Sequence, residues 1–156
     1  MKAAALFFRT FLLAVFTLSL LAGAIAADYY LRHEVTRKAR RFLAERGVAL
    51  SPASAIQAAS RGEVVLLEQL EIAGISLGIG DERGRTPLLE AVKAGHGSVV
   101  DYLMDREAVW ASLNRMTEPE RETPLAAALR ARDFTLADRL LEKGATLEVD
   151  AEPGVP

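Results

Sequence analysis

The sequence predicts an all-α fold: a solenoid of about three helix-pair repeats, preceded by an N-terminal hydrophobic helix and by a capping or linking helix. Three observations lead to this prediction. A Thr-Pro-Leu motif occurs at residues 86–88 and again at residues 123–125, and apolar and glycine positions follow each copy at helical spacing. An uncharged apolar run occupies residues 10–27. A basic stretch with a single apolar stripe comes directly after that run.

The first element is residues 1–27, for which two interpretations remain open: a cleaved signal peptide or an uncleaved transmembrane signal-anchor. Lys2 and Arg9 precede the apolar run, whose length just reaches the roughly 17–25 residues of a spanning helix. Residues 24–26, Ala-Ile-Ala, fit the small-x-small site of a cleaved signal. A buried core helix is disfavoured, because the rest of the chain is too small to cover an apolar helix on all sides.

The charges around this segment point to opposite membrane orientations. The positive-inside rule favours a cytoplasmic location for the downstream part, since basic residues follow the run at Arg32, Arg37, Lys38, Arg40 and Arg41. The order of basic start, apolar run and small residues is that of an export signal. We expect localisation at the inner membrane with the repeats in the periplasm, or release into the periplasm after cleavage near Ala26. The cytoplasmic face of the membrane is the alternative.

Residues 28–50 are expected to contain a linking or capping helix that ends near Gly47. Its apolar positions recur at steps of three and four and form one stripe, made of Leu31, Val35, Ala39, Phe42 and Leu43. One interpretation is a basic helix lying at anionic lipid headgroups. The favoured interpretation is a helix that covers the exposed edge of the first repeat, because a repeat stack needs a capping element at each end.

The repeats are expected over residues 51–150, divided at about 51–82, 83–117 and 118–150, with a tail at 151–156. Thr86-Pro87-Leu88-Leu89-Glu90-Ala91 matches the T-P-L-H-x-A signature of a period of about 33 residues, except that Leu89 replaces the histidine. The third unit closes on Leu-Leu-Glu-Lys-Gly-Ala, residues 140–145. One period before Thr86 lies Ala53, and Gly62 then falls under Gly95. The chain resembles exported or membrane-anchored ankyrin-repeat proteins of bacterial type.

The motif residues have physical roles that support this resemblance. Thr86 and Thr123 are suited to cap the first helix of a unit, and a proline fits the position after the cap, where no N–H is needed. Ala91 lets two helices approach closely. Gly95 is suited to the left-handed conformation that ends a helix. Each helix pair cannot bury its own apolar face, so neighbouring pairs must stack.

Two departures from the pattern stand out. Arg132 occupies the place of Gly95 in the third unit, which predicts either strain or a different turn. The interval from Thr86 to Thr123 is about four residues longer than the standard period, and the extra length lies between residues 105 and 122. Trp110 in this stretch aligns with Leu77. It is interpreted as packed beneath the loop, or alternatively as an interface anchor, since tryptophan is enriched at binding hot spots.

Composition and motifs exclude several classes of function. A net charge of −2 does not favour nucleic-acid binding. The chain has no cysteine, which excludes disulfides, thiolate metal ligands and a cysteine nucleophile. Neither His33 nor His96 has further ligands at metal-binding spacing, and His96 is interpreted as hydrogen-bonded between helices. We predict no enzymatic activity, no catalytic residues, no metal or cofactor and no small-molecule substrate.

The resemblance to ankyrin proteins implies protein binding through finger loops and a concave face, by a module held at or exported across the inner membrane. The implied partner-binding residues are Glu82, Arg83 and Arg85 in one finger, Glu118, Glu120, Arg121 and Glu122 in the other, Gln57, Arg61, Glu90, Lys93 and Arg130 on the concave face, and Trp110 and Arg115 in the inserted stretch. The alternatives are a periplasmic immunity or neutralising protein for a toxic enzyme, an envelope accessory factor, and a structural membrane subunit acting through its apolar helix.

Overall fold

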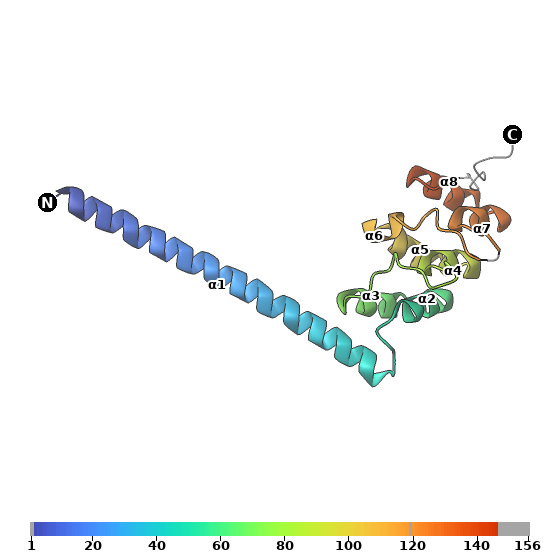
Figure 1. The fold of residues 1–156 in the computed structure, drawn as a ribbon, viewed down its shortest axis with the longest axis horizontal. Coiled ribbons are helices and arrows are strands. Elements are labelled where there is room, and N and C mark those ends of the chain that lie inside the picture. The colour runs from blue at the N-terminus through green and yellow to red at the C-terminus, as the bar shows by residue number, and fades with distance from the viewer. Residues whose placement is uncertain (1, 119, 147–156) are drawn as a thin grey trace. The chain divides into compact units, whose positions relative to one another are not determined.

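The computed structural model describes residues 2–118 and 120–146, and side chains from residue 15 onward. Within this part of the chain there are eight α-helices and no strand, as the all-α prediction requires (Figure 1). The predicted tail, 151–156, and the last residues of the predicted third repeat, 147–150, lie outside the described residues. The chain divides into two compact units, residues 1–38 and residues 39–156, and each is described by itself.

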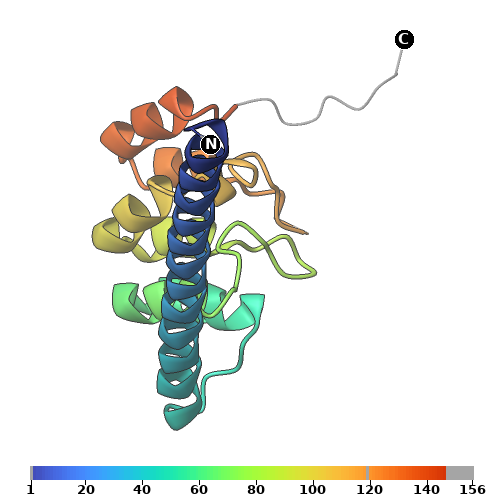
Figure 2. The same cartoon turned by 90° about the vertical axis from the view of Figure 1, so that its left-hand side faces the viewer.

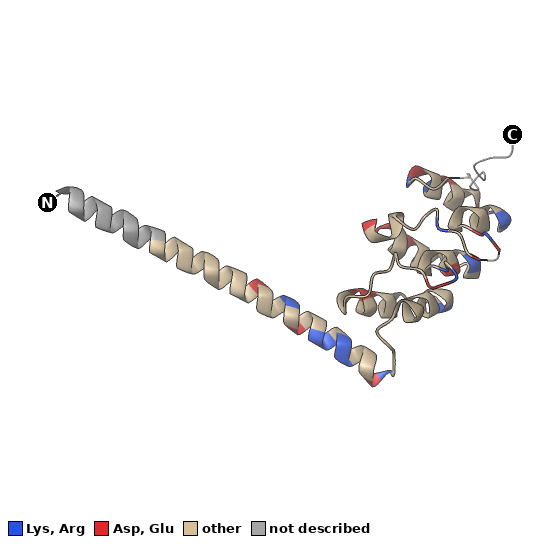
Figure 3. Cartoon of the chain, in the orientation of Figure 1, with Lys and Arg blue, Asp and Glu red and all other residues tan. Residues whose placement is uncertain are grey.

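Helix α1, Lys2–Glu45, is one continuous helix through the expected boundary at Asp28. The sequence predicted two elements there, but no helix-breaking residue separates them. A single glycine inside a helical pattern is tolerated, and ion pairs four residues apart support the helix. Arg32 pairs with Asp28 and Arg41 with Glu45, each at 2.8 Å. From residue 15 onward the first charged residue of α1 is Asp28, and Figure 3 shows the charged positions gathered in the part of α1 towards its C-terminal end.

The predicted membrane-spanning segment receives no support from the structure. Among the helices of the described residues, none is both long and apolar enough to cross a lipid bilayer. The apolar run begins before residue 15, in a part of α1 whose side chains lie outside the description.

The last part of α1 belongs to the repeat unit and covers the first helix pair. Ala39 and Leu43 are buried, and Phe42 packs against the same core. The Arg40 guanidinium donates a hydrogen bond to the carbonyl of Ala73 at 3.2 Å. Gly47 then takes a φ of 66° as the chain leaves the helix. This is the arrangement that the capping interpretation predicts for the end of the stripe.

Three helix pairs follow, and they form the repeat stack. Their bounds are α2 Pro52–Arg61 with α3 Val64–Ile72, α4 Pro87–Ala94 with α5 Gly97–Met104, and α7 Pro124–Arg130 with α8 Phe134–Glu142. A short helix, α6, spans Glu107–Trp110. The inner helices α2, α4 and α7 pack in a row, α2 on α4 and α4 on α7. Figure 2 shows the loops before α4 and α7 on the side of the stack opposite the outer helices α3, α5 and α8.

Each inner helix begins with the expected cap. The side-chain oxygen of Thr86 accepts a hydrogen bond from the Leu89 N–H, and that of Thr123 from the Ala126 N–H, both at 3.2 Å. In the first repeat Ser51 is the cap and Pro52 the first helical residue. This cap lies two residues before Ala53, the residue that stands one period ahead of Thr86. Helix α2 is longer than α4 at its N-terminus because a serine and a proline stand there.

The turns that end the inner helices use the left-handed conformation in all three repeats. Gly62 and Gly95 have φ of 79° and 72°, and Arg132 has a φ of 60°. The expectation of strain at Arg132 is thus met, since a side chain at positive φ is disfavoured. His96 lies with its Nε2 3.1 Å from the Ser60 carbonyl and its ring against Gly62, so it does bridge the first two repeats.

The joint between the second and third repeats is built differently. Asp133 stands in the place of His96, and its carboxylate accepts the Leu136 N–H at 3.0 Å as the cap of α8. The hydrogen bond of this carboxylate therefore lies within its own repeat. An open pocket of about 290 Å³ lies between α4–α5 and α7–α8, lined on one side by Gly95 and Gly97. At the second joint Asp133, in the place that His96 has at the first, lines this pocket.

Arg132→Gly is expected to raise the free energy of unfolding by about 0.5–1 kcal/mol. Arg132→Gly removes the strain of a side chain in the left-handed conformation, about 1–2 kcal/mol. This gain exceeds the free-energy cost of the conformational entropy that glycine adds to the unfolded chain. Urea unfolding followed by far-UV circular dichroism measures the change. Gly95→Ala is the matched control: nothing lies within 4 Å of an added Cβ there, so it should lose about 1 kcal/mol through strain alone. Equal stability of all three proteins would contradict this account of the turns.

Candidate functional site

The two loops that precede α4 and α7 are termed the first finger, residues 78–85, and the second finger, residues 115–122, of which residue 119 is not described. They are joined by a backbone hydrogen bond from the Glu118 N–H to the Arg83 carbonyl at 2.9 Å. Gly84 is buried, and a Cβ placed on it would collide with the Met116 carbonyl. The absence of a side chain at Gly84 therefore lets the fingers pack backbone to backbone.

Asp81 holds the turn of the first finger. Its Oδ1 accepts hydrogen bonds from the backbone N–H groups of Arg83 and Arg85, each at 3.0 Å, and its Oδ2 accepts one from the Arg85 guanidinium at 2.8 Å. Partial burial raises the pKa of Asp81, but these hydrogen bonds outweigh it and hold the pKa below its usual value. The pKa of Arg85 is raised in turn by its hydrogen bond to Asp81. The turn is fixed and its central charges cancel.

Thr117 takes the place of Asp81 in the second finger. Its hydroxyl accepts the Glu122 N–H at 3.1 Å, and its own N–H donates to the Glu122 carbonyl at 3.1 Å. Counting back from the capping threonines, the sequence predicts that Glu118 matches Asp81; this is wrong by one residue, because the segment from Thr117 to Thr123 is one residue longer than that from Asp81 to Thr86. Arg121, with a φ of 51°, takes the role that glycine has in the first finger.

Glu122 is the residue whose place the sequence predicted least well. It was expected as an exposed finger contact, but its side chain is only 3% exposed. One carboxylate oxygen lies 2.6 Å from Nη1 of Arg130, and the other lies 3.5 Å from Nζ of Lys93. The structure thus joins Lys93 at the end of α4 and Arg130 at the end of α7 through a buried carboxylate. A sequence signal was present: Glu122 directly precedes the capping Thr123, a position that Arg85 holds in the repeat before.

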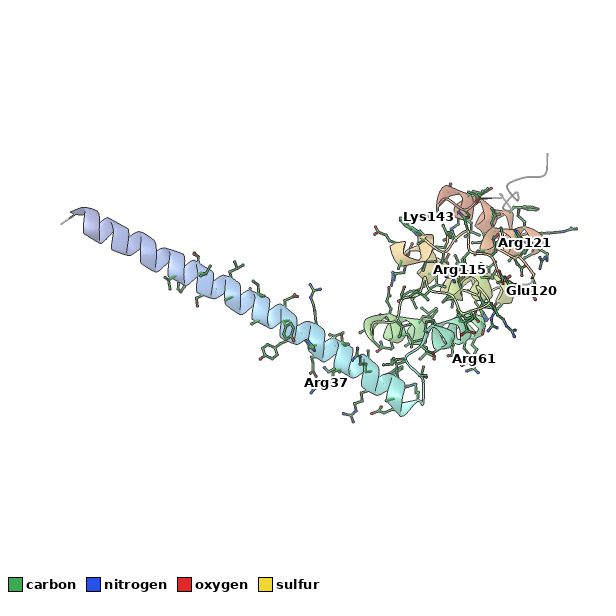
Figure 4. The ribbon with its side chains drawn as sticks, viewed as in Figure 1. Arg37, Arg61, Arg115, Glu120, Arg121 and Lys143 are labelled. Carbon is green, nitrogen blue, oxygen red and sulfur yellow. The ribbon has the colours of Figure 1, made fainter. Side chains whose placement is uncertain are left out.

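The remaining predicted finger residues are exposed. They are Glu82, Arg83, Glu118, Glu120 and Arg121, and Arg115, predicted in the inserted stretch, is exposed as well. Figure 4 labels Arg115, Glu120 and Arg121. Glu90 on α4 is half-buried. A groove of about 510 Å³ brings Glu90 and Arg85 together with polar residues of α2, among them Gln57 and Ser60. The fingers and the exposed ends of α2, α4 and α7 therefore form one continuous surface, which we term the inner face.

Trp110 lies elsewhere in the repeat unit. Leu113, not Trp110, fills the buried position equivalent to Leu77, because α6 and its turn are inserted ahead of it. The alignment of Trp110 with Leu77 is wrong for that reason. The indole N–H donates to the Met104 carbonyl at 2.9 Å, the Lys143 ammonium lies 4.4 Å from the ring centroid, and the residue is 38% exposed. Trp110 thus packs against the end of α8 rather than beneath a finger.

Comparison with known proteins identifies a matching family and a partial relative. The ankyrin-repeat family (three copies) matches residues 55–151, which is more than half of the chain. An L-asparaginase of Dirofilaria immitis is 28% identical over 103 residues, which cover 66% of this chain. The matched region spans only 17% of that relative's length.

The double variant Lys93→Met/Arg130→Met is expected to lower the free energy of unfolding by about 2–3 kcal/mol, because it leaves a buried carboxylate without a cation. Chemical denaturation of the full chain measures the loss. Arg139→Met is the control, since its partner Asp101 is 62% exposed and such surface pairs contribute under about 1 kcal/mol. A double variant as stable as the Arg139 control would show that Glu122 does not need its cations.

Proposed function

Because this chain belongs to the ankyrin-repeat family, we propose that it is a protein–protein interaction module that binds its partner through the inner face. Ankyrin repeats are generally binding modules without enzymatic activity. The observation that carries the proposal is that both fingers are already ordered in the protein without a partner. Their turns are held by Asp81 and Thr117, and their backbones are bonded to each other. A surface that is already ordered loses little conformational entropy when it binds.

The exposed charges of the fingers support the same proposal. Within the described residues, six exposed charged side chains of the fingers form no ion pair and are free to contact a partner: Glu82, Arg83, Arg115, Glu118, Glu120 and Arg121. On the other side of the stack, Arg106 ahead of α6 is paired with Glu71, and Arg139 on α8 is paired with Asp101, so these two arginines are less free to contact a partner. Charged groups on an interface steer the encounter and select the partner.

The name of the asparaginase relative transfers no activity to this chain, since the match spans 17% of that protein. The immunity or neutralising role and the role of a structural membrane subunit remain narrower alternatives. Both would use the same module, and fold alone does not choose between them.

Arg83→Glu combined with Arg115→Glu is expected to reduce partner capture about tenfold or more, with little change in melting temperature, because neither side chain is buried or ion-paired. Capture is quantified by photo-crosslinking from a probe residue at Glu120 in lysate of the native cells. Glu68→Lys with Glu142→Lys, exposed on the outer helices, reverses two charges as a control. An equal loss of capture in both double variants would refute binding through the inner face.

We also propose that residues 1–27 target the chain to the inner membrane, with the repeats on the periplasmic side. The support is in the sequence: Lys2 and Arg9 ahead of an uncharged run, and the small-x-small residues 24–26 at its end. Cell fractionation of the full chain with a C-terminal reporter tests this. A shorter periplasmic product indicates a cleaved signal, and a full-length membrane product indicates an anchor. A full-length protein found only in the cytosol would refute targeting.

A further inference from the structure

Glu122 holds two cations from two different repeats. Arg130 approaches one carboxylate oxygen and Lys93 the other, at 2.6 Å and 3.5 Å. The two side chains occupy matching positions at the ends of α7 and α4. Two positive groups on one negative group leave the cluster with a net charge of +1. The cluster is the place on the inner face where a buried group fixes the position of exposed cations.

The cations have hydrogen-bonding capacity that Glu122 does not use. A guanidinium carries five N–H donors and an ammonium three, and each group meets Glu122 through a single ion pair. The Arg130 side chain is 71% exposed and that of Lys93 is 42% exposed. Their remaining donors therefore face solvent. Because the carboxylate below is buried, both long side chains are already partly ordered before a partner arrives, which lowers the entropy cost of binding.

A negatively charged acceptor complements this arrangement. Hydrogen bonds between Arg or Lys and a carboxylate are roughly twice as strong as neutral ones. The groove around the first finger offers no such excess of positive charge, because Asp81 pairs with Arg85 and Glu90 lines the same groove. The second finger bears exposed Glu118 and Glu120 beside exposed Arg115 and Arg121, so it also offers no uniformly positive surface to an extended acidic one. The complementary ligand is a single acidic side chain flanked by neutral or basic residues.

We propose that the partner presents one aspartate or glutamate side chain to the inner face, and that Lys93 and Arg130 bind its carboxylate on the solvent side of Glu122. This inference rests on the proposed function and names the chemistry of the partner at that surface. Glu122 is a positioning residue in this arrangement, since it acts on the partner through the two cations. The first finger and the second finger then contact the residues on either side of the acidic one.

The test uses the full chain labelled with nitrogen-15 at arginine side chains. The probe is acetyl-Gly-Glu-Gly-amide, and the comparison peptide carries Gln in place of Glu. The Arg130 Nε–H signal is expected to shift and saturate at millimolar concentrations of the Glu peptide only, and Lys93→Gln should weaken the apparent affinity about fivefold or more. Arg139, which has one carboxylate partner at 2.7 Å, serves as the internal control and should not respond.

Three outcomes would overturn the inference: an equal response to the Gln peptide, an equal response at Arg139, or binding of a phosphoserine peptide but not the Glu peptide, which would indicate a phosphorylated partner. Lys93→Gln leaves Arg130 on Glu122, and its circular dichroism spectrum checks that the fold is kept. If the Glu peptide fails the titration test while crosslinking from the fingers is normal, the proposal of an acidic ligand is refuted and the proposed binding module is not. Loss of selective crosslinking from the fingers refutes the module itself.

Discussion

A helix pair of this size cannot bury its own apolar face, and the rest of the structure depends on that constraint. The inner helices meet through small residues, Ala58, Ala91 and Ala128, all of which are buried. Small side chains let the helix backbones approach, and the outer helices then close over the same core. Every feature of the inner face is positioned by this stacking, because the fingers connect one pair to the next.

The dependence on neighbours can be seen at equivalent positions. Val92, six residues after the capping threonine of the second repeat, is 6% exposed, whereas Leu129 at the same place in the third repeat is 37% exposed. Met104 and Leu141 form a similar pair, at 1% and 44%. Apolar side chains that face a following repeat are buried, and those of the last described repeat are not. Burial here is a property of the stack rather than of the single unit.

The inner face has two halves that differ in how their charged side chains are paired. In the first half Asp81 and Arg85 neutralise each other inside one turn, and the result is a rigid loop with no excess charge. In the second half a buried Glu122 joins cations from two repeats and leaves one positive charge in excess. Both arrangements convert flexible charged side chains into fixed ones. This property suits a surface that recognises another protein by charge as well as by shape.

The sequence by itself determined the features that depend on local interactions. The caps at Thr86 and Thr123, the left-handed turns at Gly62 and Gly95, and the repeat pattern all follow from the chemistry of residues a few positions apart. The family and the all-α fold were predictable for that reason. Most of the finger residues lie on exposed loops, since turns between buried helices must lie at the surface, but Glu122 does not.

Only the tertiary structure decided where the insertion is absorbed and which charges meet. Leu113 rather than Trp110 enters the core, and the cap of α2 is Ser51, two residues before the place that the spacing from Thr86 gives. Glu122 is buried between Lys93 and Arg130, three residues spread over more than one repeat. The physical reason is the same in each case: a fixed repeat spacing specifies which residues lie on which face of a helix, but contacts between repeats depend on how the helices pack.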